Sequence, residues 1–442
     1  MAVSINEFKL PMAPMAARDF VQRATDSLGI FIDLDRICEL LAVLTLSSND
    51  LAREVNEIAG QSVSLGDKST IIQALLDHGA NMSDFQTNWR KPDMLYLNAD
   101  AKSNLERDEN LDKAGRDILR IYQTFTTNNY NLSILRSLTD YPRSKILSFD
   151  GHRMLKVNPE WRLLNTSRIG SASPNIQGLS RDLGDIFTYP AGYVLVRADS
   201  KQIEPRINFS HFIRDDLIVK MISYYDDAYF GLLHYCTASE ADLRAFRENF
   251  DTAFKQIEIT DEIVNKRQTI KTLTNAGSYG SSNLQRVDHT LASAFDKRVK
   301  HHPARIEMER KVAEAVDRGV TTFYGAFGTP VTPAAKESYT PGSPGYRNHM
   351  IRCGINNPIQ VTASELMICG MDVARQLLEE ASDSYLIYYK HDECCFLVSE
   401  KDAEKGFVEK FGEVTAYNVS GWIPIGSDLL IGKKDPVFES YL

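Results

Sequence analysis

The sequence predicts an α+β fold, in which a helical first third is followed by a sheet that a helical block interrupts. Residues 34–58 place their apolar side chains on one face of a helix. The segments "DGHRMLKVNP" and "YVLVRAD" are typical of strands, and "YLIYYK-HD-ECCFLV" is typical of a hairpin with a two-residue turn. Strands on both sides of a helical middle, behind a helical arm, favour the α+β class.

The first third supports this class element by element. Residues 1–27 form a leader with three Met and two Pro. Gly60 is a stop signal for the helix over 34–58. "DKSTIIQALLDHG" predicts a second helix with Asp67 as its cap and Gly79 at its end.

Two further segments complete the helical arm. Residues 80–109 are polar, and we expect a loop there. A third helix follows, because Ala114, Ile118 and Phe125 lie in helical register.

The remaining two thirds alternate between strands and helices. A polar, helical block runs from about residue 210 to 315, and "GVTTFYGAFGTPVTP" resembles a hairpin. The last hundred residues predict one helix over 362–381 and the hairpin already named. We find neither an internal repeat nor a low-complexity tract.

Composition limits the classes of protein. The chain has 442 residues, more than one hydrophobic core usually spans, and a formal charge of −9. A protein that coats DNA is usually basic, so a nucleic-acid surface would be a local channel on an acidic body. The six cysteines lack a CxxC pair, and we expect them to be buried, reduced thiols of an intracellular protein. We expect neither a secretory signal nor a membrane span.

The first segment that can carry chemistry is "YVLVRADSKQIEPR". Asp199 ends an apolar strand, where its carboxylate can hold a hard cation, and Glu204 follows at a strand-to-helix transition. An Asp after a strand is more commonly a helix cap, so this alternative stays open.

The second segment is the turn of the hairpin. His391 and Asp392 form the turn, and Glu393 follows them. A plain turn is the simpler interpretation, since Asp is favoured in turns. Together with Asp199, however, Asp392 could share two Mg²⁺ ions roughly 3.5–4 Å apart, the geometry of nucleotidyl transfer.

The third segment is "KRQTIKTLTNAGSYGSS". Four side chains recur every four residues and form one stripe on a predicted helix: Arg267, Lys271, Asn275 and Tyr279. Two cations one turn apart suit a triphosphate, and the aromatic residue suits its base or sugar end. The alternative is a solvated basic face, although the nearby glycines indicate a close approach.

In this order the three segments resemble the polymerase motifs of family A DNA polymerases, the DNA polymerase I type. "DSKQIEPR" resembles D-Y-S-Q-I-E-L-R, "RQTIKTLTNAGSYG" keeps the frame R-x3-K-x7-Y-G, and "HDE" is similar to the third motif. "TSRIGSASPNIQGLSR" and "RCGINNPIQVTASEL" resemble two further blocks, and "GIFIDLDRICELL" resembles the entry to the thumb. The likeness spans residues 28 to 442.

The resemblance implies a right-hand polymerase fold with a helical thumb, an antiparallel β palm and helical fingers. Its expected divisions are a leader at 1–27, a thumb at 28–150, palm at 151–208 and 346–442, and fingers at 209–345 with a nucleotide-binding helix at 261–280. It also implies a DNA-directed DNA polymerase that adds dNMP to a primer 3′-hydroxyl.

The resemblance further implies a role for each matching residue. Asp199, Asp392 and the Ser200 carbonyl would hold two Mg²⁺ ions, for which Mn²⁺ can substitute, and Glu393 would support this catalytic site. Glu204 would exclude a ribose 2′-hydroxyl, while Arg267, Lys271, Asn275 and Tyr279 would bind the incoming dNTP. The implied contacts with primer–template DNA are Arg168, Asn175, Gln177, Arg352, Asn356, Gln360 and His391.

The sequence departs from the family at some positions. Asn275 stands where Phe or Tyr is usual beside the sugar, and Lys201 and Pro205 also differ. Such drift suggests a phage or plasmid origin. Only about 28 residues precede the thumb, so we expect no 3′–5′ exonuclease domain.

We expect a monomer in the cytoplasm of a bacterial or phage-infected cell, with an unidentified processivity partner as an option. The alternatives are a single-subunit RNA polymerase, against which Glu204 argues, and a non-catalytic primer–template-binding protein. One basic cluster is as much a candidate template contact as a solvated face: Lys297, Arg298, Lys300, His301, His302 and Arg305.

Overall fold

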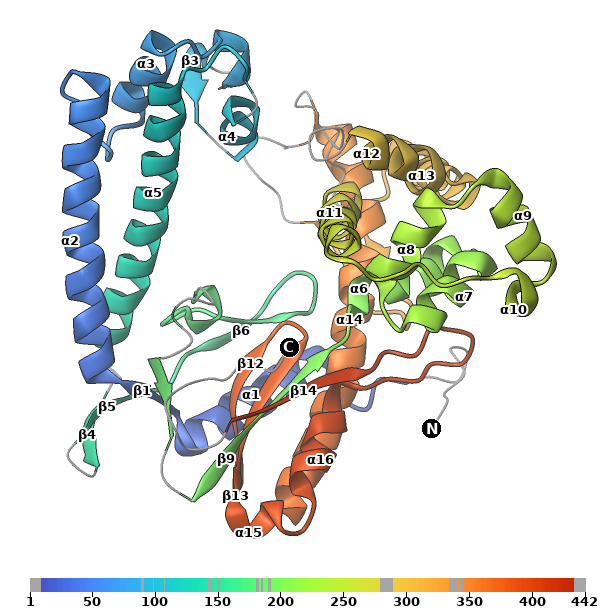
Figure 1. Ribbon diagram of the computed structural model, residues 1–442. Helices are drawn as coiled ribbons and strands as arrows, with labels where there is room; N and C mark the ends of the chain where they lie inside the picture. The colour runs from blue at the N-terminus through green and yellow to red at the C-terminus, as the bar shows by residue number, and fades with distance from the viewer. Residues whose placement is uncertain are drawn as a thin grey trace. The chain divides into compact units, whose positions relative to one another are not determined.

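The computed structural model describes the chain except residues 1–8, 89–90, 98, 107, 141–144, 150–151, 180–182, 184–185, 190–191, 279–288, 334–340, 342–344 and 433–442. The chain divides into two compact units (Figure 1). Unit 1 comprises residues 1–29, 160–172 and 189–442, and unit 2 comprises residues 30–159 and 173–188. Residues 173–188, which we expected within the palm, therefore cluster with unit 2.

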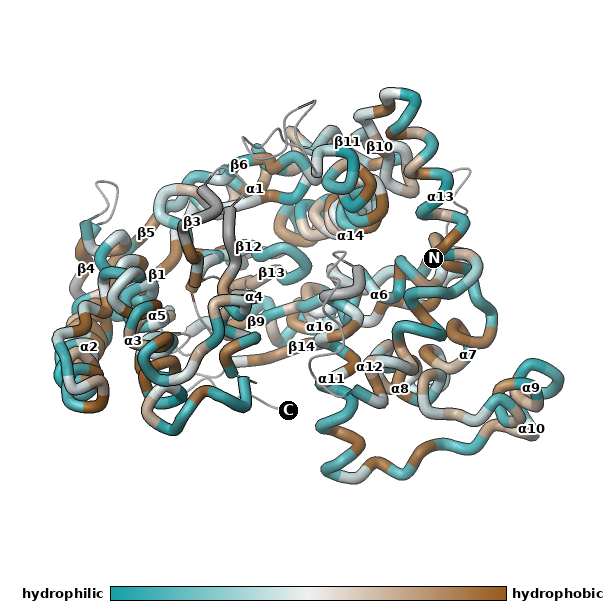
Figure 2. Tube along the Cα trace, turned by 90° about the horizontal axis from the view of Figure 1, so that it is seen from above, coloured by the Kyte–Doolittle hydropathy of each residue, from teal (hydrophilic) through white to brown (hydrophobic). Residues whose placement is uncertain are grey.

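Unit 2 is built on two long helices, α2 (Leu34–Ala59) and α5 (Lys113–Thr139), which pack against each other. Figure 2, in which the molecule is seen from above, shows both hydrophilic (teal) and hydrophobic (brown) residues on α2, in accord with an amphipathic helix. The side chain of Asp33 caps α2, and Gly60 ends it with φ of +62°. The predicted helix over 34–58 is therefore confirmed.

The second predicted helix of unit 2 is α3 (Lys68–Asp77), and Asp67 caps it as expected. The predicted loop over 80–109 is wrong. This stretch contains a short helical turn, a two-stranded hairpin and a helix: η2 (Met82–Asp84), β2 (Gln86–Asn88), β3 (Lys91–Tyr96) and α4 (Ala99–Leu105). Phe85, Leu97 and Leu105 bury their side chains in the core of unit 2, so a few apolar residues suffice to order a largely polar segment.

A small antiparallel sheet closes unit 2, in the order β4-β5-β1-β8. Its strands are β1 (Ile30–Asp33), β4 (Lys145–Phe149), β5 (His152–Val157) and β8 (Phe187–Thr188). The strand predicted from "DGHRMLKVNP" is β5, which is confirmed.

Unit 1 contains a four-stranded antiparallel sheet in the order β12-β13-β9-β14. Its strands are β9 (Tyr193–Ser200), β12 (Ser384–Lys390), β13 (Glu393–Ser399) and β14 (Ser427–Gly432). The predicted strand "YVLVRAD" and the predicted hairpin are confirmed as β9 and β12–β13. We did not expect β14, which pairs with the free edge of β9.

Helices flank this sheet. The long helix α14 (Tyr346–Glu380) runs behind it in Figure 1 and begins sixteen residues before the predicted start at 362, so that prediction is wrong at its start. Gly354 and Pro358 lie inside the helix, and they obscure the pattern in the sequence. Within the expected leader, α1 (Pro14–Leu28) packs against β12, α14 and β6 (Trp161–Leu163). Strand β6 forms a hairpin with β7 (Ile169–Ser171). Trp161 donates from Nε1 to Thr25 Oγ1 over 2.8 Å.

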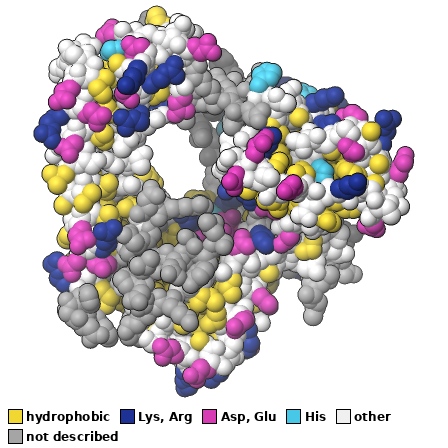
Figure 3. Space-filling view, in the orientation of Figure 1, with side chains coloured by type: hydrophobic (Ala, Val, Ile, Leu, Met, Phe, Trp, Pro, Cys, Tyr) yellow, Lys and Arg dark blue, Asp and Glu magenta, His cyan; other side chains and the backbone are white. Residues whose placement is uncertain are grey.

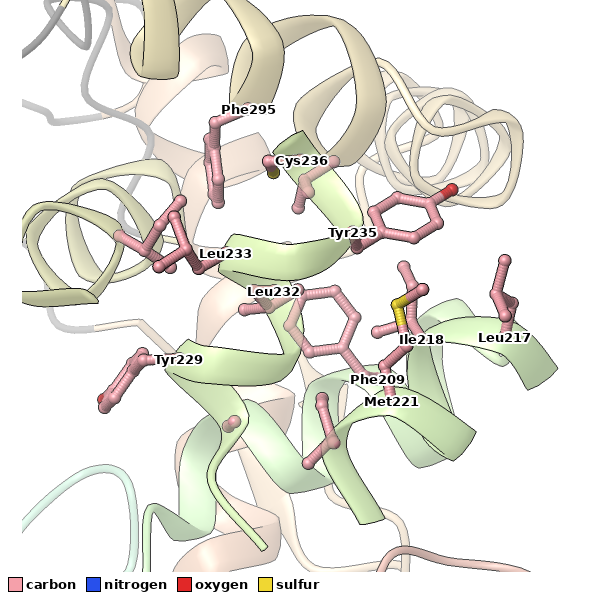
Figure 4. Packing of buried hydrophobic residues seen from close by; sticks show 14 of the residues in the cluster. Phe209, Leu217, Ile218, Met221, Tyr229, Leu232, Leu233, Tyr235, Cys236 and Phe295 are labelled. Carbon is pink, nitrogen blue, oxygen red and sulfur yellow. The ribbon is translucent and has the colours of Figure 1, made fainter. Parts of the chain in front are cut away.

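The helical block of unit 1 has its own core. Its elements are α6 (Ile203–Ile207), the π-helical turn η5 (Asn208–Ile213), α7 (Asp216–Tyr225), α8 (Ala228–Thr237), α9 (Glu240–Glu248), α10 (Phe250–Ala253), α11 (Asp261–Ser278), α12 (His289–Phe295), the π-helical turn η7 (Asp296–Lys300) and α13 (Pro303–Asp317). Figure 4 shows Phe209, Ile218 and Leu232 from three of these elements packed together.

The remaining elements are short. The predicted hairpin at "GVTTFYGAFGTPVTP" is confirmed as β10 (Phe323–Tyr324) and β11 (Pro330–Val331). The others are η3 (Ile176–Gly178) in unit 2 and, in unit 1, α15 (Glu400–Ala403), α16 (Phe407–Gly412) and η9 (Glu413–Thr415). No helix among the described residues is long and apolar enough to cross a membrane. All six cysteines are free. The expected burial is confirmed for Cys236, Cys394 and Cys395, whereas Cys353 and Cys369 are half-buried and Cys38 is exposed.

Candidate active site

The candidate site lies in unit 1, at one end of its sheet, and begins with Asp199. In β9, Asp199 pairs with Glu393 of β13 on one side and with Asp428 of β14 on the other. Residues that pair directly across antiparallel strands project their side chains from the same face. Three carboxylates therefore gather on one face of the sheet, around Asp199.

A fourth carboxylate adjoins this group from the turn between β12 and β13. His391 adopts φ of +52°, which the two-residue turn requires, and its carbonyl accepts a hydrogen bond from Tyr389 over 3.0 Å. The Ser200 amide donates to the Asp392 carbonyl over 2.8 Å. This bond fixes the turn that carries Asp392 to the end of the strand that carries Asp199.

The carboxylates influence each other electrostatically. Burial, reinforced by the negative charges of Asp392, Glu393 and Asp428, raises the pKa of Asp199 to about 7. Burial also raises the pKa of Asp392, although its own backbone amide and the Arg168 charge work in the opposite direction. Buried negative charge of this kind is stabilised by a cation.

Glu393 differs from the two aspartates because it forms an ion pair with an arginine. Arg197 donates to it from Nε over 2.9 Å and from Nη2 over 2.8 Å. Although burial acts in the opposite direction, these hydrogen bonds lower the pKa of Glu393. Glu393 is therefore a charged side chain held on the Arg197 side of the site.

The donor set fits Mg²⁺ better than a metal ion whose ligands all come from protein side chains. Among the described residues, no group of three or more His, Cys, Asp or Glu side chains could hold an ion. Mg²⁺ is usually bound by one or two carboxylates together with water and substrate phosphates, which matches Asp199 and Asp392. The Ser200 hydroxyl donates to the Thr415 carbonyl over 2.9 Å inside the protein, so Ser200 has only its backbone carbonyl to offer.

The predicted nucleotide-binding helix is α11, over Asp261–Ser278. Ile270 and Leu273 are buried in the core of the helical block, while Arg267 and Lys271 are half-buried. Arg267 bonds Asp227, and its guanidinium lies 5.3 Å from the ring centre of Tyr229. Asn275 is exposed, and Tyr279 lies outside the described residues.

A small cavity of about 20 Å³ brings several predicted residues together. Its walls come from α6, α11 and α14, and its lining is Glu204, Pro205, Thr274, Asn275, Asn356, Ile359 and Gln360. Four of these are residues that the sequence assigned to nucleotide or DNA. The cavity therefore brings α6, α11 and α14 together beside Glu204.

Glu204 itself forms an ion pair with Arg168, which lies between β6 and β7. Both side chains are mostly buried. The Arg168 charge also opposes the rise that burial causes in the pKa of Asp392, so Arg168 acts electrostatically on the carboxylate site as well as on Glu204.

The other predicted DNA contacts occupy two places. Arg352 is exposed on α14, one and two turns ahead of Asn356 and Gln360. In unit 2, Asn175 caps η3 by accepting from the Gly178 amide over 3.1 Å, and Gln177 lies within η3. The Tyr130 hydroxyl donates to the Gly178 carbonyl over 3.0 Å and holds this turn on α5.

The basic cluster that we singled out is largely engaged within unit 1. Arg298 donates to the carbonyls of Tyr235, Cys236 and Ala238 at the end of α8. Arg305 bonds Glu309, and His302 contacts Asp215. On the face shown in Figure 3, described Lys and Arg side chains are interspersed with Asp and Glu.

Sequence reasoning missed Asp428 and Asp227. Asp428 belongs to β14, whose pairing with β9 could not be foreseen from "SDLLIG", although its alternation is a weak strand signal. Lys201 approaches Asp428 at 3.6 Å and Asp226 at 2.8 Å. Asp227 has the signal of a helix cap, but nothing local connects it with Arg267, forty residues later.

The arrangement of the described elements has a counterpart among solved structures. The chain is similar to the POL domain of Pol1 from M. smegmatis, in complex with DNA primer-template and dNTP, with a TM-score of 0.69 and 20% identity over 93% of this chain and 69% of that one. The predicted α+β right-hand polymerase fold is confirmed.

The chain is also similar to curated proteins named DNA polymerase I. The chain is 23% identical to DNA polymerase I of Mycobacterium tuberculosis over 423 residues, 91% of this chain and 41% of the relative. It is 26% identical to DNA polymerase I of Pseudomonas aeruginosa over 254 residues, 54% of this chain and 25% of the relative. The chain thus spans less than half the length of these relatives. No family model matches it.

These findings confirm the predicted resemblance to the DNA polymerase I type. The expected phage or plasmid origin and the expected absence of an exonuclease domain stay predictions.

Proposed function

We propose that the chain is a template-directed DNA polymerase that adds dNMP to the 3′-hydroxyl of a primer by two-metal nucleotidyl transfer. The observation that carries the proposal is the pair Asp199 and Asp392, joined at one strand end through the Ser200 amide, with the pKa of both carboxyls raised. Relatives named DNA polymerase I support it.

Asp199, Asp392 and the Ser200 carbonyl would hold two Mg²⁺ ions. When bound, such ions make a hydroxyl a better nucleophile and neutralise charge on a leaving pyrophosphate. Glu393 would stabilise the end of the sheet next to the metal site, because it accepts two hydrogen bonds from Arg197 of the neighbouring strand.

Arg267 and Lys271 would bind the triphosphate of the incoming dNTP, with Asn275 and Tyr279 beside its sugar and base. Glu204 would exclude a ribose 2′-hydroxyl, and the small size of the cavity that it lines, about 20 Å³, supports this role. Its ion pair with Arg168 would keep the Glu204 side chain in one position.

Residues 28–150, which make up most of unit 2, would be the thumb. Residues 151–208 and 346–442, which include the sheet of unit 1, would be the palm. Residues 209–345 would be the fingers. Primer–template DNA would contact Arg168, Asn175, Gln177, Arg352, Asn356, Gln360 and His391. The enzyme would act in the cytoplasm of a bacterial or phage-infected cell.

The test is extension of a 5′-labelled primer–template with Mg²⁺, with dNTPs and NTPs supplied separately, and with Asp392→Ala beside the native protein. Extension with dNTPs alone, lost in the variant and on removal of Mg²⁺, is the expected result. Extension with NTPs would identify an RNA polymerase instead. Tight primer–template binding without extension would point to a non-catalytic protein.

A further inference from the structure

We propose that Asp227 is a positioning residue that fixes the Arg267 guanidinium relative to the catalytic strand, so that its remaining N–H donors meet the triphosphate of a dNTP. This inference rests on the proposed function, in which Arg267 binds that triphosphate. It concerns a residue that neither the motifs nor the resemblance pointed to.

Asp227 holds the guanidinium along one edge. Arg267 donates from Nε to both Asp227 oxygens at 3.2 Å, and from Nη2 to Oδ2 at 2.5 Å. The two side chains are only 25% and 17% exposed. A pair of this shape is directional as well as charged, because the planar fork of arginine matches a carboxylate.

Two aromatic rings also contact the Arg267 guanidinium. The guanidinium carbon lies 5.3 Å from the Tyr229 ring centre and 5.2 Å from that of Phe230, within cation–π distance. Lys271 Nζ lies 5.9 Å from the same Tyr229 ring. Figure 4 shows Tyr229 on the opposite side of α8 from Ile218, at the margin of the core. Both predicted phosphate-binding cations therefore meet at one ring in the first turn of α8.

Asp227 is itself held by hydrogen bonds from two backbone amides, which makes it an anchor for Arg267. As the N-cap of α8, it accepts from the Tyr229 amide at 2.9 Å and from the Phe230 amide at 2.8 Å. Although burial acts in the opposite direction, the Arg267 hydrogen bond lowers the pKa of Asp227, so that it stays charged.

The anchor is connected to the catalytic strand. Gln202 donates from Nε2 to Asp227 Oδ2 over 2.7 Å and accepts from the Ala228 amide over 2.5 Å. Gln202 lies three residues after Asp199 and adopts φ of +50° just ahead of α6. Asp227 thus links the helix that carries Arg267 to the strand that carries Asp199.

One edge of Arg267 remains for a ligand. A guanidinium has five N–H donors, and the pair with Asp227 uses Nε and Nη2. None of the described residues bonds Nη1. An oriented arginine loses less conformational entropy when it binds a phosphate, so removal of its anchor should weaken nucleotide binding.

The experiment compares Asp227→Asn with Asp215→Asn. Asn caps a helix about as well as Asp, so the first change keeps the cap of α8 and removes the charge. Asp215 is a matched control, because it caps α7 and contacts His302 over 3.0 Å and Arg247 at 3.6 Å, but does not hydrogen-bond Arg267. Circular dichroism melting checks that both variants fold.

For Asp227→Asn we expect the KM and the directly titrated Kd of dATP to rise about 5- to 10-fold, with kcat changed less than about twofold. The Asp215→Asn variant should stay within about twofold of the native values. In an Arg267→Ala background, Asp227→Asn should have no further effect, because Asp227 acts through Arg267.

Three outcomes separate the two proposals. An unchanged Kd in Asp227→Asn, or an effect that persists without Arg267, overturns the positioning role while extension by the native protein stands. The second outcome is that Asp227→Asn loses dATP binding in an Arg267-dependent manner, while the native protein binds dATP but does not extend primers. This result supports the positioning role and overturns the proposed polymerase activity. A native protein that binds no dATP overturns both.

Discussion

Asp199 and Asp428 are paired directly across β9 and β14, so their carboxylates extend from the same face of the sheet. The pair matters because the Asp428 charge is one of the causes that raise the pKa of Asp199. The candidate metal site is therefore bordered on both flanks by carboxylates, with Glu393 on the other strand.

The first prediction concerns this flanking charge. Asp428→Asn should raise the half-saturating Mg²⁺ concentration of primer extension about 3- to 10-fold, because it weakens the negative potential that attracts the ion. Lys201→Gln removes the cation 3.6 Å from Asp428 and should change the Mg²⁺ requirement in the opposite direction. Mg²⁺ titrations of both variants test this, and equal half-saturation in all three proteins would contradict it.

The second prediction concerns pH. Because the pKa of Asp199 is about 7 in the fold and near 3.8 otherwise, the folded protein binds its proton more tightly. Protonation of Asp199 therefore stabilises the fold; this contribution to the free energy of unfolding is fully present below about pH 4 and is lost as the pH rises through 7. The side chain that Asp199→Asn introduces is neutral at every pH. At pH 8 the free energy of unfolding of this variant should therefore be about 1–3 kcal/mol higher than that of the native protein.

Thermal unfolding in EDTA, at pH 4 and pH 8, measures this difference. The increase in the free energy of unfolding should be absent at pH 4, where the Asp199 carboxyl of the native protein is already protonated in the folded state. A gain of the same size at both pH values would mean that the effect of the substitution is not electrostatic.

The third prediction concerns Glu204. Glu204→Ala enlarges a cavity of about 20 Å³ and removes the partner of Arg168. We expect the preference for dNTP over NTP, as a ratio of kcat/KM, to fall about 10- to 100-fold. Single-nucleotide incorporation with dATP and ATP checks it. Glu204→Gln keeps the volume of the side chain, and a comparable loss there would assign the selectivity to charge instead of size.

The fourth prediction concerns stability away from the site. Asp402 is fully buried and accepts from the Ser382 and Asp383 amides at 3.2 and 2.8 Å, and from the Ser384 hydroxyl at 2.9 Å. Asp402→Ala leaves these donors without their acceptor and should cost about 2–4 kcal/mol. Urea unfolding measures this cost, and Glu400→Ala, an exposed change on the same helix, should cost less than about 0.5 kcal/mol.

The parts of the site that local patterns specify could be predicted from the sequence. The β-branched run before Asp199 and the apolar strands around His391 and Asp392 predicted the strand and the hairpin, because strand propensity and turn chemistry act over a few residues. The four-residue spacing of Arg267 and Lys271 likewise predicted one helix face.

The rest depends on contacts between distant segments. No local signal connects Asp428 with Asp199, or Asp227 with Arg267, since strand neighbours and helix docking are selected by tertiary packing. The segment 80–109 was misjudged for a related reason. Its short elements are stabilised by burial of Phe85 and Leu97, and a mainly polar composition hides them.

The position of β9 between β13 and β14 has a consequence for biosynthesis. Asp199 leaves the ribosome well before residues 393–399 and 427–432, which supply both of its neighbours in the sheet. Until then the nascent strand has two open edges, a known hazard for aggregation. The candidate active site can therefore assemble only when translation has passed residue 432, and a ribosome stalled earlier yields a chain without it.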